Sequence, residues 1–89
     1  MRMKKLSPEY LEKLGHRLKL IRIYLKYDQK QMSKVLDTAQ SQISKIEAGN
    51  AAPTLYQVLK LKRLAEEDDY LRENLSWDWI LEGKGRGIL

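Results

Sequence analysis

The sequence predicts an all-α fold in a single small domain. Apolar residues recur every three or four positions along most of the chain, as they do on the buried face of a helix. Residues that favour helix N-termini precede several of these stretches, and no run of alternating β-branched residues predicts a strand. A chain of 89 residues can bury only a modest core. We therefore expect one domain over residues 1–89, with its core at about 8–83 and flexible ends at 1–6 and 84–89.

The first helix is predicted at about residues 8–26. Ser7 and Pro8 provide an N-cap followed by a proline at the first helical position. An apolar stripe then follows at helical spacing: Leu11, Leu14, Leu18, Ile21 and Leu25. Gly15 adjoins this stripe and has no side chain, so a neighbouring segment could approach the helix closely there.

Residues 28–50 predict two short helices joined by a tight turn. Asp28 and Gln31 have the spacing of a capping box at the start of the first helix. Asp37 tolerates the left-handed conformation that a sharp turn needs, and Gly49 can end the second helix. We place the two helices at about 29–36 and 40–48. Together they describe a helix-turn-helix unit.

The second of these helices has one apolar and one polar face. Ile43 and Ile46 mark the side that we expect to be buried. The residues that face away from them are polar: Gln40, Ser41, Ser44 and Lys45. Such side chains can hydrogen-bond to base edges in a DNA major groove. A solvated helix face without a ligand would have the same composition, so the pattern by itself leaves both interpretations open.

The positive charge of the chain is concentrated in its N-terminal half. Residues 1–50 carry a net charge of +6, and residues 51–89 carry a net charge of −1. The basic half contains the helix-turn-helix, as expected if that unit meets DNA phosphates. A basic half would also suit an acidic protein partner.

The sequence gives no support for a catalytic, metal, cofactor or membrane role. The absence of cysteine excludes disulfides and thiolate metal sites, and it fits a cytoplasmic protein. His16 is the single histidine, and there is no acid–base constellation or glycine-rich phosphate loop. No apolar run approaches the ~18 residues of a membrane span. We therefore expect no catalytic residue, no metal, no cofactor and no membrane contact.

The C-terminal third predicts further helices. Thr54 is a good N-cap for an apolar helix. The acidic residues 66–69 either cap a separate helix through Asp68 or Asp69 or lengthen the preceding one. Ser76 is expected to cap a short last helix at 77–82. That helix is unusually apolar for its length, which predicts either a cap on the core or a dimer contact through Trp77, Trp79 and Ile80.

From about residue 15 to residue 83, the chain resembles the lambda-repressor-like helix-turn-helix family of Cro/Xre type. The matching segments are "LGHRLKLIR", Gln29, "ISKIEAGN", "PT" and "SWDWILEG". The resemblance implies a compact five-helix bundle whose third helix enters the major groove. It implies base contacts by Gln40, Ser41 and Lys45.

The resemblance also implies roles outside the recognition helix. Gln29 would bind a DNA phosphate, and Asn50 would touch the DNA backbone. Arg22 and Glu47 would form a buried salt bridge between the first and third helices. Beside these implied roles, Lys30 contributes to a general positive field with Lys26 and Lys34, and we expect it to contact a DNA phosphate.

The sequence departs from the family pattern in three places. Ser33 replaces an alanine in the second helix, which is acceptable if its hydroxyl bonds back to the preceding turn. Asp37 replaces the turn glycine. About eight additional residues, near 66–73, precede the last helix and alter the expected boundary there.

These observations favour a sequence-specific DNA-binding protein, a transcriptional repressor that acts as a homodimer. Two alternatives stay open: an antitoxin that presents the "SWDWIL" segment to a toxin, and a protein-interaction module that binds no DNA. An enzyme is the least favoured class. We expect the core to consist of Leu18, Ile21, Met32, Leu36, Ile43, Ile46, Leu55, Val58 and Leu59.

Overall fold

The computed structural model of the protein describes residues 6–88. Within these residues the chain forms helices and no strand, which confirms the all-α prediction. The helices are α1 (Pro8–Tyr24), α2 (Gln29–Val35), α3 (Gln40–Glu47), α4 (Leu55–Ala65), α5 (Asp69–Asn74) and α6 (Trp77–Glu82). Residues 1–5 and Leu89, which belong to the ends that we expected to be flexible, lie outside the described part.

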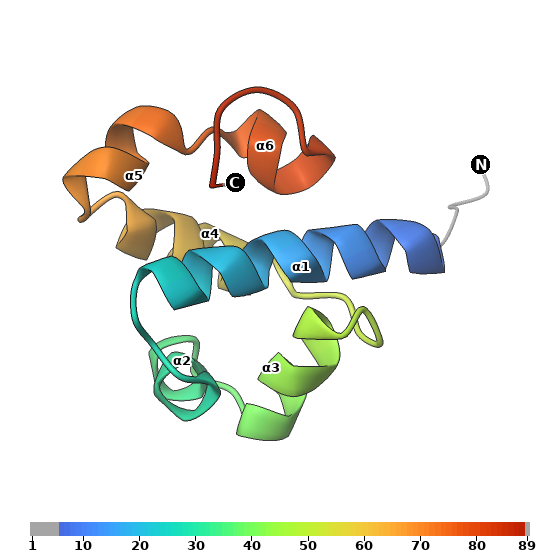
Figure 1. Cartoon of the computed structure of the whole chain (residues 1–89). Coiled ribbons are helices and arrows are strands. Elements are labelled where there is room, and N and C mark those ends of the chain that lie inside the picture. The colour runs from blue at the N-terminus through green and yellow to red at the C-terminus, as the bar shows by residue number, and fades with distance from the viewer. Residues whose placement is uncertain (1–5, 89) are drawn as a thin grey trace.

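The long helix α1 runs through the middle of the molecule (Figure 1). Helices α2 and α3 lie on one side of it, and α5 and α6 lie on the other. Helix α3 packs against both α1 and α2, and α6 packs against α1. The buried apolar residues form one cluster: Leu14, Leu18, Ile21, Met32, Leu36, Ile43, Ile46, Val58, Leu61, Ala65, Leu71, Leu75, Trp79 and Ile80.

Local sequence explains where most of the helices begin. Five of them start after a residue whose side chain accepts a hydrogen bond from a backbone N–H three positions later: Ser7, Asp28, Thr54, Asp68 and Ser76. A cap of this kind stabilises a helix by about 1 kcal/mol. Helix α3 differs, because its N-cap is Ala39 and has no side-chain acceptor.

Residues with positive φ follow four of the helices: α1, α2, α3 and α6. Lys26 has a φ of 64°, and α1 therefore stops at Tyr24, two residues before the predicted end. Gly49 has a φ of 81° after α3, as the sequence predicted, and Gly83 has a φ of 71° after α6.

The acidic segment after α4 begins a separate helix. The carboxylate of Asp68 accepts a hydrogen bond from the backbone N–H of Leu71 at 3.0 Å. Leu71 and Leu75 are buried, so α5 contributes to the core. The described chain therefore has six helices where five were expected, and the additional one lies in the insertion near 66–73.

The prediction of two core residues in α4 was wrong. The buried stripe of α4 runs through Val58 and Leu61. Leu59 lies about 100° around the helix from Val58 and is only partly buried. Leu55 occupies the first turn, and 82% of its surface is exposed.

The C-terminal segment from Lys84 to Ile88 belongs to the end that we expected to be flexible. It folds back over α6, where the carbonyl oxygen of Arg86 accepts a hydrogen bond from Ser76 Oγ at 3.2 Å. Gly87 lies so close to the ring of Trp79 that a Cβ there would overlap it. Ile88 packs against the core, so this segment covers Trp79.

Candidate nucleic-acid interface

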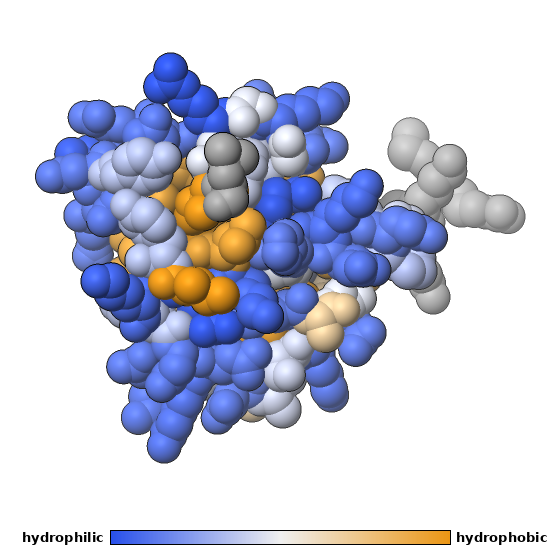
Figure 2. Space-filling view, in the orientation of Figure 1, coloured by the Kyte–Doolittle hydropathy of each residue, from blue (hydrophilic) through white to orange (hydrophobic). Residues whose placement is uncertain are grey.

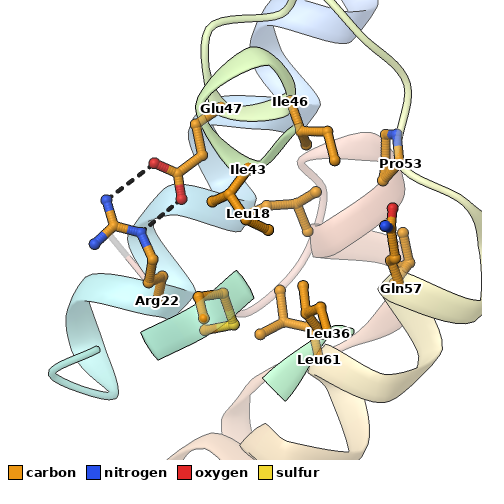
Figure 3. Close-up of a pocket in the computed structure, with 11 residues that line it drawn as sticks. Leu18, Arg22, Leu36, Ile43, Ile46, Glu47, Pro53, Gln57 and Leu61 are labelled. Carbon is orange, nitrogen blue, oxygen red and sulfur yellow. Dashed lines mark hydrogen bonds and ion pairs between the residues drawn. The ribbon is translucent and has the colours of Figure 1, made fainter. Parts of the chain in front are cut away.

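The inner face of α3 fixes this helix to the rest of the domain. Ile43 and Ile46 are buried and meet side chains from other parts of the domain (Figure 3). These are Leu18 of α1, Leu36 directly after α2, and Leu61 of α4. The cavity that remains among them is about 20 Å³, space for about one water molecule. The interior beneath α3 is therefore a packed support and has no room for a larger ligand.

Gly15 sets how closely α3 approaches α1. A Cβ at this position would overlap the backbone carbonyl oxygen of Ile46 and would lie 3.0 Å from that of Glu47. Both obstacles are main-chain atoms, which cannot move aside as a flexible side chain can. The close approach that the sequence suggested at Gly15 is thus the contact between α1 and the last turn of α3.

The outer face of α3 carries the side chains expected to read DNA. Gln40, Ser41, Ser44 and Lys45 are all exposed. The surface around α2 and α3 is mainly hydrophilic on the side shown in Figure 2, in contrast to the apolar patch above α1. The four side chains offer amide, hydroxyl and ammonium groups over two turns of one helix, which is the chemistry of base-edge recognition.

The turn between α2 and α3 adopts the conformation that its sequence predicted. Asp37 has a φ of 55°, in the left-handed region. The backbone N–H of Thr38 donates to the carbonyl oxygen of Ser33 at 2.9 Å. The hydroxyl of Ser33 donates back to the carbonyl oxygen of Lys30 at 2.7 Å, so it is satisfied where an alanine was expected.

Glu47, at the C-terminal end of α3, is the centre of a polar network. Its carboxylate accepts hydrogen bonds from Arg22 Nε at 2.6 Å and from Arg22 Nη2 at 2.9 Å (Figure 3). Arg22 Nη1 also donates to the carbonyl oxygen of Tyr27 at 2.7 Å. Because the charged guanidinium binds the carboxylate, the pKa of Arg22 is raised above its ordinary value. The network joins α1, the following loop and α3.

Gln29 belongs to the same network. Its side-chain N–H donates to Glu47 Oε1 at 3.0 Å, and the residue is half-buried. Gln29 was expected to contact a DNA phosphate. It also has a structural role that sequence reasoning missed, because it binds Glu47. Lys30 and Asn50, by contrast, are exposed, one in the first turn of α2 and the other directly after Gly49.

The proposed dimer residues do not share one environment. Trp79 and Ile80 are only 7% and 1% exposed within the single chain. This burial contradicts their assignment to a dimer contact, because the C-terminal segment and the core already cover them. Trp77 is 39% exposed and lies beneath the ammonium of Lys62, which is 5.5 Å from the ring centroid.

Two side chains of α1 hold the end of α6 in place. Arg17 Nε donates to the carbonyl oxygen of Ile80 at 2.8 Å, and Tyr10 Oη donates to that of Leu81 at the same distance. These carbonyl groups belong to the last turn of α6, where a helix leaves its acceptors unpaired. No local sequence pattern predicts these contacts, because the partners lie more than 60 residues apart.

Neither a membrane-spanning helix nor a metal-binding cluster is found between residues 6 and 88. No helix in that range is both long enough and apolar enough to cross a membrane. The same residues include no cluster of three histidine, cysteine or acidic side chains able to hold a metal ion.

The fold and the exposed face of α3 define a helix-turn-helix protein. The chain belongs to the family described as "Helix-turn-helix domain", whose model matches residues 15–86. This match covers every residue of α2 and α3 and suggests DNA binding. No curated protein matches the sequence.

Proposed function

We propose that this protein binds double-stranded DNA in a sequence-specific manner and acts as a homodimeric transcriptional repressor of the Cro/Xre type. The observation that carries the proposal is the arrangement of α3. Ile43 and Ile46 anchor one face, while Gln40, Ser41, Ser44 and Lys45 are exposed on the other. A helix held in this way can enter a major groove without rearrangement of the domain.

Each polar side chain of the interface has a separate task in this proposal. Gln40 would make two hydrogen bonds to an adenine, and Lys45 would donate to a guanine. Ser41 and Ser44 would donate to base edges or to phosphates. Lys30 and Asn50 would contact the phosphate backbone, which fixes register without reading sequence.

Gln29 would contact phosphate through the group that Glu47 leaves free. A glutamine amide has two N–H donors, and Glu47 accepts from this side chain at 3.0 Å. That bond would orient the amide, and the second N–H would point a donor at a phosphate oxygen. The polar network would thereby couple the stability of the fold to the position of the DNA.

A homodimer is part of the proposal because one small module buries little surface on DNA. Two copies on adjacent half-sites gain affinity through their linkage. The half-sites would lie about 34 Å apart, one turn of B-DNA. Trp77 is the residue among the three predicted dimer contacts that is exposed enough to contribute.

The test is selection of duplexes by the full chain from a random library. We expect enrichment of one site with two-fold symmetry, and binding that weakens as salt rises. Recovery of unrelated sequences would contradict specific recognition. Failure to bind any duplex at low salt would instead favour a protein-interaction module.

No observation favours the antitoxin alternative. It depended on the "SWDWIL" segment as a surface for the toxin. Trp79 and Ile80 of that segment are buried in the single chain, so its free apolar surface is much smaller than the sequence suggested.

A further inference from the structure

A groove on the outside of α4 is not used by the DNA-binding proposal. It has a volume of about 350 Å³ and lies between the end of α2 and one face of α4. Its lining residues are Val35, Tyr56, Leu59, Lys60, Arg63, Leu64 and Glu67. Tyr56, Lys60 and Arg63 follow each other on α4 at spacings of four and three. They mark a stripe about 10 Å long at 1.5 Å per residue, and Glu67 lies beyond the C-terminal end of the helix.

The groove combines apolar and basic side chains. Val35, Leu59 and Leu64 are partly buried and leave apolar surface open in the groove. Tyr56 is 59% exposed and lies beneath the ammonium of Lys60, 5.6 Å from the ring centroid. The aromatic ring therefore continues the apolar surface and also holds a cation beside it.

The cations of the groove are not neutralised within the described chain. Lys60 and Arg63 form no ion pair with residues 6–88, whereas Lys62 on the opposite side of α4 pairs with Glu66 at 3.6 Å. Lys34, next to Val35, adds a third positive charge; Lys34 and Arg63 are exposed, and Lys60 is partly exposed. Glu67 is the single acidic residue of the lining and lies at one end. The unmatched charge is positive along most of the groove.

We propose that this groove binds an acidic amphipathic helix of another protein. Apolar side chains of that helix would contact Val35, Leu59 and Leu64, and its carboxylates would face Lys34, Lys60 and Arg63. Apolar anchors at helical spacing are the usual way in which a helix occupies a groove, and the opposite charge at the rim selects the partner. Because Val35 belongs to α2, the partner would rest directly on the helix-turn-helix unit.

The experiment uses two synthetic peptides of about 14 residues, which as helices are about 21 Å long and span the groove. Both peptides carry leucine at the same i, i+3, i+4 and i+7 positions. In the acidic peptide every remaining position is glutamate, and in the basic peptide every remaining position is lysine. Each is titrated into the ¹⁵N-labelled full chain. We expect the acidic peptide to shift the amide signals of Val35, Leu59 and Leu64, and the basic peptide to leave them unchanged.

Charge-reversal variants distinguish binding in the groove from nonspecific electrostatic attraction between peptide and protein. Arg63→Glu should weaken acidic-peptide binding by about fivefold or more, because it removes one attractive charge pair at the rim and replaces it with a repulsive one. Lys13→Glu makes the same change of charge on exposed α1 surface and should leave binding within about twofold. Leu59→Ala should weaken binding without affecting its salt dependence.

Three results would overturn the proposal. One is the absence of shifts at the groove with the acidic peptide, and another is equal binding of both peptides. The third is a loss of duplex affinity in Arg63→Glu with unchanged peptide affinity, which would assign these cations to DNA phosphates.

Discussion

Glu47 is the residue on which the position of the recognition helix most directly depends. Its carboxylate accepts hydrogen bonds from Arg22 and Gln29, and the Arg22 side chain is only 11% exposed. A charge buried to this extent needs its partner, since an unpaired ion in the interior is strongly unfavourable. The pair is therefore expected to affect folding more than it affects DNA contact.

Arg22→Ala should lower the free energy of unfolding by about 3 kcal/mol. This value is at the lower end of the range for breaking a buried ion pair, because Gln29 still donates a hydrogen bond to Glu47 in the variant. Urea denaturation measures the change. Lys13→Ala removes an exposed positive charge from the same helix and should change stability by less than ~0.5 kcal/mol. An Arg22→Ala protein with unchanged stability but no DNA binding would show that Arg22 is a phosphate contact.

At the scale of elements, the contact between α1 and α3 decides where the helix-turn-helix sits. Gly15 allows the backbones to touch at Ile46 and Glu47, and the two isoleucines of α3 fill the space beside that contact. Helix α1 also holds the end of α6 through Tyr10 and Arg17. One helix thus positions both the helix-turn-helix unit and the C-terminal helix.

Gly15→Ala should destabilise the protein by about 1–3 kcal/mol, because the added methyl group must push α1 and α3 apart. The direction is informative, since alanine in an unhindered helix would be stabilising by about 1 kcal/mol relative to glycine. Thermal and urea unfolding provide the measurement, with His16→Ala as a control on the exposed face. A stability gain in Gly15→Ala would contradict the close contact.

On the scale of the whole molecule, the basic half of the chain contains α1 and the helix-turn-helix, and the acidic residues 66–69 lie between α4 and α5 and at the start of α5. Trp77 is exposed at the start of α6, on the far side of α1 from α2 and α3. A second copy bound there would leave both recognition helices uncovered. We therefore expect the contact between the two copies of the proposed dimer to form around Trp77.

Trp77→Ala should weaken the dimer by about 2 kcal/mol, or roughly 30-fold, if this tryptophan is an interface anchor. Sedimentation of both proteins over a concentration series tests this. Tyr56→Ala, at another exposed aromatic residue, is the matched control and should leave the dimer intact. A wild-type monomer at tens of micromolar, both free and on DNA, would remove the homodimer from the proposal.

Sequence patterns predicted most helices and the turn because the signals are local. Capping residues, the left-handed Asp37 and the glycine after α3 act within a few positions of each other. The Arg22–Glu47 pair came from a family resemblance, and the structure contains it. The roles of the exposed residues in DNA binding stay predictions.

What the sequence did not predict depends on distant neighbours. The exposure of Leu55 reflects the lack of a packing partner beside the first turn of α4, which no apolar spacing reveals. The burial of Trp79 depends on Gly87 and Ile88, which follow α6 and fold back over it. Likewise, the contacts of Tyr10 and Arg17 with α6 require the folded arrangement.

The central claim is that α3 reads DNA sequence, and the affinity of Gln40→Ala for two duplexes tests it most directly. On the selected site the variant should lose ~1–3 kcal/mol of binding free energy and its preference at one base pair. On random duplex it should bind like the wild type. Lys30→Ala is the comparison: it should lose a little affinity on every duplex and show a shallower salt dependence. Equal weakening of both duplexes by Gln40→Ala would contradict the account, because Gln40 would then carry no sequence information.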